Sequence, residues 1–305
     1  MPLGAWTIRI CSRCGQRQRV PFAGMSEIDE GQWPIEVCRE RVRRAGEIRT
    51  EIGSEWNTYL ADHPRQIDVV RGDTDTSWTF VVKTLTPMPV RLSALFGEWL
   101  YELRAALDGI VYYLAVRDSS QNPPPAERGI FFPVFTDPAK YDDSNHRGRM
   151  KALSDKTFAL LRQVQPFNAQ PDHRSNTLWW IEELARIDRH RQGHALAPHI
   201  EKIKIGHQKP LQTVGGIIAE AHKLIPIDES APTPILNLEA PAGWDAQQVR
   251  DHLDVTDAIT SRLDVTEWVR NSTEPMKSME LSQRMVRCEQ FVLEGVINPL
   301  ATGDI

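Results

Sequence analysis

The stretch RLSALFGEWLYELRAALDGIVYYLAVR, residues 91–117, contains the longest uninterrupted helical pattern in the chain. Its apolar residues recur every three or four positions, so that on a helix they form one stripe. The stripe consists of Leu92, Phe96, Trp99, Leu103, Leu107, Ile110 and Leu114. A helix of this kind must cover its stripe with other elements. We therefore predict that it is the core helix of the fold.

Polar residues follow one edge of this stripe. Gly97, Arg104 and Asp108 line up there, and a glycine permits close approach of another backbone. Arg104 and Asp108 are four residues apart and can pair along the helix. One interpretation is an exposed ion pair worth about 0.3–0.5 kcal/mol. The other is a half-buried Arg104 that reaches a partner on another helix.

An aspartate interrupts the apolar face of a second predicted helix, residues 177–191. Thr177, Ile181, Leu184 and Asp188 project from one side of it. A buried carboxylate is costly unless it is paired. We therefore expect Asp188 to have a cationic or backbone partner, and Arg104 is the first candidate.

The end of that helix adds two further candidate site residues, His190 and Arg191. Together with Arg104, Asp108 and Asp188 they could form one polar site between two core helices. A purely structural alternative is that His190 and Arg191 complement the helix dipole ahead of a C-terminal cap at Gly193.

The remaining pattern predicts an α+β fold. A helical bundle core would carry a β-hairpin, a C-terminal antiparallel sheet and a closing C-terminal helix. The expected helices are 33–60, 150–164 and 279–300, and the expected hairpin strands are 66–71 and 78–83. The expected sheet strands are 200–205, 214–221, 223–227 and 234–238, and strands are also preferred within the ambiguous stretch 245–269.

Three regions follow from these elements. Residues 1–32 form an irregular N-terminal extension, 33–195 the helical core with its inserted hairpin, and 196–305 a β region with the last helix, packed as one unit with the core. Cys11 and Cys14 have the spacing of half a zinc ribbon. A closed zinc site needs four ligands, and a second such pair is missing. The alternative is two free thiols, so no cofactor is expected.

Composition favours a soluble cytoplasmic protein without a membrane partner. The net charge is −5 and 41% of the residues are apolar. No run of about 18 apolar residues occurs, and the N-terminus lacks the apolar segment of a secretory signal. The run 39–44 is rich in arginine; it indicates a solvated face or, alternatively, a nucleic-acid contact. The sequence contains no phosphate-binding glycine loop and no serine-hydrolase elbow.

Four short motifs occur in a recognisable order. They are Gly97 followed by LRAALD at 103–108, FP at 132–133, QPF at 165–167 and DRHR at 188–191. Together, over about residues 33–195, they resemble a family of uncharacterised bacterial proteins often found in actinobacteria. That family implies no established activity.

The family often has a histidine directly after L-D, which produces an R-x4-H motif. This motif resembles that of the HEPN superfamily, helical bundles that include metal-independent ribonucleases. Such cleavage needs a histidine as general acid or base and an arginine that stabilises the phosphorane. Here Gly109 replaces the histidine, and Gly193 interrupts a second R-x4-H between Arg189 and His194.

The sequence therefore favours a binding or interaction protein, with a small ligand, a nucleic acid or a protein as the partner. The alternative is a HEPN-like ribonuclease, toxin-like or defence-related.

Overall fold

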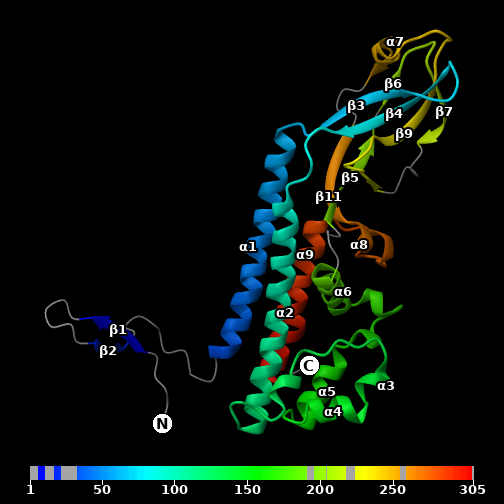
Figure 1. Ribbon diagram of the computed structural model, residues 1–305. Helices are drawn as coiled ribbons and strands as arrows, with labels where there is room; N and C mark the ends of the chain where they lie inside the picture. The colour runs from blue at the N-terminus through cyan, green and yellow to red at the C-terminus, as the bar shows by residue number, and fades with distance from the viewer. Residues whose placement is uncertain are drawn as a thin grey trace.

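The computed structural model describes residues 6–10, 17–21, 33–190, 196–203, 205–217, 224–254 and 259–303. The protein is α+β, with a long helical bundle at one end and antiparallel sheets at the other (Figure 1). This architecture confirms the predicted fold class. A separate two-stranded ladder, β1 (Trp6–Ile10) with β2 (Arg17–Pro21), precedes the bundle in the chain.

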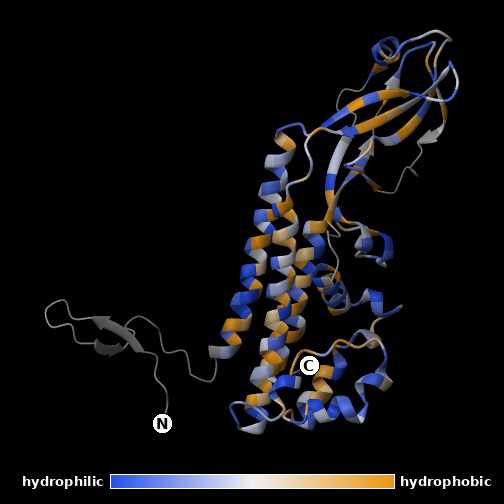
Figure 2. Cartoon of the chain, in the orientation of Figure 1, coloured by the Kyte–Doolittle hydropathy of each residue, from blue (hydrophilic) through white to orange (hydrophobic). Residues whose placement is uncertain are grey.

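Two antiparallel helices form the long axis of the bundle: α1 (Trp33–Ala61) and α2 (Val90–Ser119). At 1.5 Å per residue each is about 45 Å long. All seven predicted stripe residues of α2 are at most 1% exposed. The expectation that α2 is the core helix is therefore confirmed, and Figure 2 shows apolar residues along its length.

Shorter helices follow α2 in the chain; the first three lie at its C-terminal end and the fourth lies beside its middle (Figure 1). They are α3 (Pro138–Tyr141), α4 (Ser144–Arg149), α5 (Asp155–Gln163) and α6 (Thr177–His190). One helix was expected at 150–164, but α5 begins only at Asp155, so the predicted start is wrong. Ser154 is the N-cap residue: its side chain accepts a hydrogen bond from the Thr157 backbone N–H. Within α6, Trp180 is buried, whereas Trp179 is half-buried.

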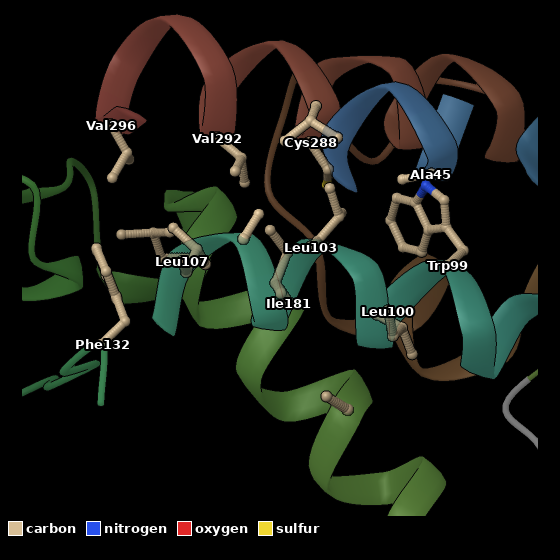
Figure 3. Packing of buried hydrophobic residues seen from close by; sticks show 14 of the residues in the cluster. Ala45, Trp99, Leu100, Leu103, Leu107, Phe132, Ile181, Cys288, Val292 and Val296 are labelled. Atoms are coloured by element: carbon tan, nitrogen blue, oxygen red, sulfur yellow. The ribbon is translucent and has the colours of Figure 1, made fainter. Parts of the chain in front are cut away.

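The expected C-terminal helix is present, and it packs along α2. It runs through α9 (Leu281–Gln290), the π-helical segment η4 (Phe291–Ile297) and α10 (Asn298–Thr302). Figure 3 shows Cys288, Val292 and Val296 of this helix facing Leu103 and Leu107 of α2.

The hairpin strands β3 (Arg65–Arg71) and β4 (Ser77–Thr84) confirm the predicted hairpin. They join β9 (Thr233–Glu239) and β7 (Gln212–Ile217) in one sheet of order β3-β4-β9-β7. This sheet has its own apolar cluster, which includes Trp78, Phe80 and Ile235. The structure thus groups the hairpin with the C-terminal strands, whereas the sequence suggested an insertion into the helical core.

A second sheet lies between the bundle and the four-stranded sheet (Figure 1). It contains β11 (Ile259–Val265), β5 (Leu196–Ile203) and β8 (Ile225–Pro226), in that order. The short strands β6 (Gly206–His207) and β10 (Leu253–Asp254) also pair. The ambiguous stretch 245–269 therefore contains strands, flanked by α7 (Ala246–Asp251) and α8 (Thr266–Asn271).

Candidate functional site

Arg104 is nearly buried between α2 and α6, with 13% of its side chain exposed. Its guanidinium lies 3.0 Å from Glu182 of α6 and 3.2 Å from Asp108. The interpretation that Arg104 reaches a partner on another helix is therefore confirmed. Its carboxylate partner on α6 is Glu182, where the sequence suggested Asp188.

Three of the four short motifs meet near this arginine through hydrogen bonds to one short segment. Asp108 Oδ1 accepts from the backbone N–H of Phe132 at 2.8 Å, and Arg104 donates to the Phe132 carbonyl at 3.4 Å. Gln165, which is fully buried, donates to the Pro133 carbonyl at 2.9 Å and accepts from the Phe135 N–H at 2.9 Å. The LRAALD motif thus ties Phe132 to α2, and Gln165 ties Pro133 and Phe135 to the end of α5, which is a structural role.

Asp188 lies against a different part of α2. A Cβ atom placed on Gly97 would lie 2.8 Å from Asp188 Oδ2. Gly97 precedes Arg104 by seven residues, which is about 10 Å along a helix. The aspartate thus occupies the inward-facing position that the pattern indicated, and the glycine makes room for it.

The other predicted site residues lie outside the described part of the chain. The His190 side chain, Arg191, Cys11 and Cys14 belong to this group. Within the described residues, no group of three or more His, Cys, Asp or Glu side chains is arranged to hold a metal ion. The zinc and the His190–Arg191 parts of the predicted site stay predictions.

Position 109, where the resembled family often has histidine, faces α1. A Cβ atom on Gly109 would lie 2.9 Å from the Cys38 sulfur. Burial raises the pKa of the Cys38 thiol to about 11, so this sulfur is a neutral packing group. A histidine at 109 would therefore enter the α1–α2 contact.

The arginine-rich run on α1 is neutralised by acidic neighbours. Arg39 pairs with Glu36, Arg43 with Glu40 and Glu47, Arg44 with Glu47, and Arg41 with Glu102. Polyanion binding needs an excess of unpaired cations on one face. This geometry favours the solvated-face interpretation of residues 39–44.

Glu289 of α9 joins three helices. One of its carboxylate oxygens accepts from the Trp99 indole N–H at 2.9 Å, and Arg49 donates to both oxygens at 3.1 and 3.2 Å. Sequence periodicity alone did not single out Glu289. Glu289 lies four residues after Met285 and three before Val292, both buried, so it falls on the apolar face of its helix. The same pattern, an acid on an apolar helical face, pointed to Asp188.

A cavity of about 320 Å³ opens where α1, the β5–β11 ribbon and α9 meet. One helical face of α1 forms one wall, and β11 with the start of α9 forms the other. The lining residues are Arg49, Ile52, Gly53, Trp56, Asn57, Glu201, Ser261, Arg262, Leu263, Glu280, Leu281, Ser282 and Met285. The volume lies at the lower end of the range for small-molecule sites, and the lining is mixed apolar and polar.

Gly53 is the unusual member of this lining. It lies inside the 29-residue helix α1, and a Cβ atom at this position would have no heavy atom within 4 Å. A glycine inside a helix costs about 1 kcal/mol relative to alanine. Because no neighbour requires the missing side chain, packing does not account for this glycine. The position is exposed and belongs to the cavity lining.

Behind the cavity lies a buried charge network. Asp264 and Arg284 are fully buried and form an ion pair, and Arg262 donates to Asp264 at 2.6 Å. The Arg284 guanidinium lies 4.8 Å from the Trp268 ring centroid. Burial lowers the pKa of Arg284, and Asp264 opposes that shift. Arg262 therefore connects the cavity lining to the buried pair.

Aromatic rings complete the α1 side of the cavity. Arg65 stacks on Trp56 and Tyr59, with its guanidinium carbon 5.6 and 5.5 Å from their ring centroids. Arg65 also donates to the hydroxyl of Ser261 at 2.9 Å. Trp56 and Ser261 both line the cavity, so these contacts hold the two opposing walls in place.

Comparisons of this chain with protein-family models, with curated proteins and with solved structures found no match. Among the helices of the described residues, none has the length and apolarity that crossing a membrane requires. The assignment of a function therefore rests on the site geometry alone.

Proposed function

We propose that this is a binding protein that holds a small organic molecule in the cavity between α1, β11 and α9. The observation that carries the proposal is Gly53, a glycine inside helix α1 that lines the cavity and that no packing contact requires, although it lowers helix stability. Local instability without a packing reason is expected at functional sites.

The residue types that line the cavity support this proposal. Ile52, Trp56, Leu281 and Met285 offer apolar surface, and a few polar groups lie among them. That mixture is typical of small-molecule sites, where apolar contacts supply affinity and polar groups supply orientation. The Arg104 cluster supports a ligand role less well, because its hydrogen bonds and ion pairs are made within the protein.

The test is a fragment screen by ligand-observed NMR on the full chain, followed by two matched variants. Gly53→Leu fills the cavity, whereas Ser54→Leu adds the same side chain at the adjacent exposed position outside the lining. Fragments that bind the wild type should lose binding in Gly53→Leu and keep it in Ser54→Leu. Equal binding to all three proteins would refute the proposal.

Stability offers an independent readout of the same idea. Gly53→Ala should raise the free energy of unfolding by about 0.5–1 kcal/mol through helix propensity alone, because the added Cβ meets nothing. A loss of stability would show that Gly53 has a packing role, which would remove the observation on which the proposal rests.

A further inference from the structure

We infer that the ligand class of this cavity is an organic cation: an amine or quaternary ammonium with an apolar body, its charge set beside Glu201 and Glu280. This inference rests on the proposed function. It follows from a comparison of which charged groups in the lining already have partners and which do not.

The two lining cations are engaged. Arg49 donates through Nε to both oxygens of Glu289, a carboxylate with 11% of its side chain exposed. Arg262 donates to Asp264 through Nε at 3.0 Å and Nη2 at 2.6 Å, and to the Met279 carbonyl at 3.1 Å. Each guanidinium is therefore neutralised by a carboxylate outside the lining, and an anionic ligand would have to compete with it.

The two carboxylates of the lining, Glu201 and Glu280, form fewer close contacts with cations than the two arginines form with carboxylates. Glu201 Oε1 lies 3.6 Å from Arg262 Nη1, beyond hydrogen-bond distance, and its side chain makes no hydrogen bond within the described residues. Glu280 is exposed and forms no ion pair within the described part of the chain. An ammonium group is a donor of up to three hydrogen bonds and suits such carboxylates.

The start of α9 could favour an anion instead, because a helix N-terminus carries about half a positive charge. Here the protein supplies that anion itself. Glu280 is the N-cap residue: its backbone N–H donates to Gln283 Oε1 at 3.0 Å, and its carboxylate lies at the helix end in a capping-box arrangement. The preference of this helix end for negative charge is therefore met without a ligand.

The apolar part of the lining suits the rest of such a molecule. Ile52, Leu281 and Met285 are buried core residues whose surfaces face the cavity, and Trp56 adds an indole ring. The charge of the whole chain, −5, also favours approach of a cation.

The experiment uses three probes with the same phenyl body: 2-phenylethylammonium, 2-phenylethanol and 3-phenylpropionate. Dissociation constants are measured for the full chain by calorimetry near neutral pH. The ammonium should bind about tenfold more tightly than the alcohol, the propionate most weakly, and added salt should reduce the difference. Equal binding of ammonium and alcohol, tighter binding of the propionate, or no measurable ammonium binding would overturn the inference.

Variants locate the charge. Glu201→Gln should weaken ammonium binding about five- to tenfold and leave the alcohol unchanged, whereas Glu98→Gln, at an exposed position on α2 away from the cavity, should change neither. An unchanged ammonium affinity in Glu201→Gln would overturn the assignment of that residue.

If all three probes bind equally and Gly53→Leu abolishes their binding, the proposed binding cavity is supported and only the preference for a cation is refuted. If no molecule binds in a Gly53-dependent manner, the proposed function itself fails.

Discussion

The carboxylate of Asp188 lies against the backbone of Gly97, so close that a Cβ atom on Gly97 would be 2.8 Å from Oδ2. This contact joins α6 to α2 seven residues before Arg104, which pairs with Glu182. Two carboxylates of α6 therefore meet α2, one over a glycine and one at an arginine.

Gly97→Ala should lower the free energy of unfolding by about 1–3 kcal/mol, because the new methyl group overlaps the Asp188 carboxylate. In an Asp188→Ala background the same change should be neutral or stabilising by up to about 1 kcal/mol, since only helix propensity remains. Urea denaturation of the four proteins measures the coupling. Additive effects of the two changes would contradict the contact.

Gly109→His restores the R-x4-H spacing from Arg104, yet it should destabilise the protein by about 1–3 kcal/mol, because its Cβ would lie 2.9 Å from the Cys38 sulfur. Cys38→Ala in the same chain should recover part of that loss by removing the sulfur. Thermal unfolding of the single and double variants checks the expectation. A fully stable Gly109→His protein would show that α1 and α2 can separate at this level.

Asp264→Ala should cost about 3–5 kcal/mol, because it leaves Arg284 buried without its ionic partner. The double variant Asp264→Leu with Arg284→Met should recover much of this loss, since well-packed apolar residues can replace a buried pair. Arg262→Gln serves as the milder control, since its side chain is 16% exposed. A loss below about 1 kcal/mol in Asp264→Ala would rule out a buried pair.

Stability should fall as the pH drops below about 6.5, with His199 as one source. This residue is 2% exposed, and burial lowers its pKa, while nearby Asp264 opposes the shift. The unfolded chain, with a histidine pKa near 6.5, therefore binds more protons than the folded one in mildly acidic solution. The stability due to the neutral ring is present above that pH and is lost towards the lower folded pKa.

His199→Gln should flatten that part of the stability profile, whereas His207→Gln, at an exposed position, should not. Urea midpoints measured from about pH 7.5 to 5 provide the comparison. Identical slopes in wild type and His199→Gln would exclude His199 as the titrating group. The neutral form fits its contacts: Nδ1 lies 2.9 Å from the Ala197 carbonyl and Nε2 lies 3.4 Å from the Thr266 hydroxyl.

Part of the fold and of the site could be predicted because it depends on local period. The stripe of α2 marked its buried face, and Asp188 stood out as an acid on the inward side of α6. Asp264 could not be found in the same way. It lies in β11 between Leu263 and Val265, and all three are buried, whereas simple strand alternation would have turned Asp264 towards solvent.

The sequence by itself determined which faces of α1, α2, α6 and α9 are buried and where the hairpin turns, because 3.6- and 2-residue periods are properties of the chain alone. Only the tertiary structure decided that Arg104 meets Glu182 while Asp188 meets Gly97. Those partners are six residues apart on α6, about 9 Å. The choice between them is therefore set by how far one helix is displaced along its neighbour. The cavity at Gly53 has the same origin, since its walls come from elements more than 200 residues apart in the chain.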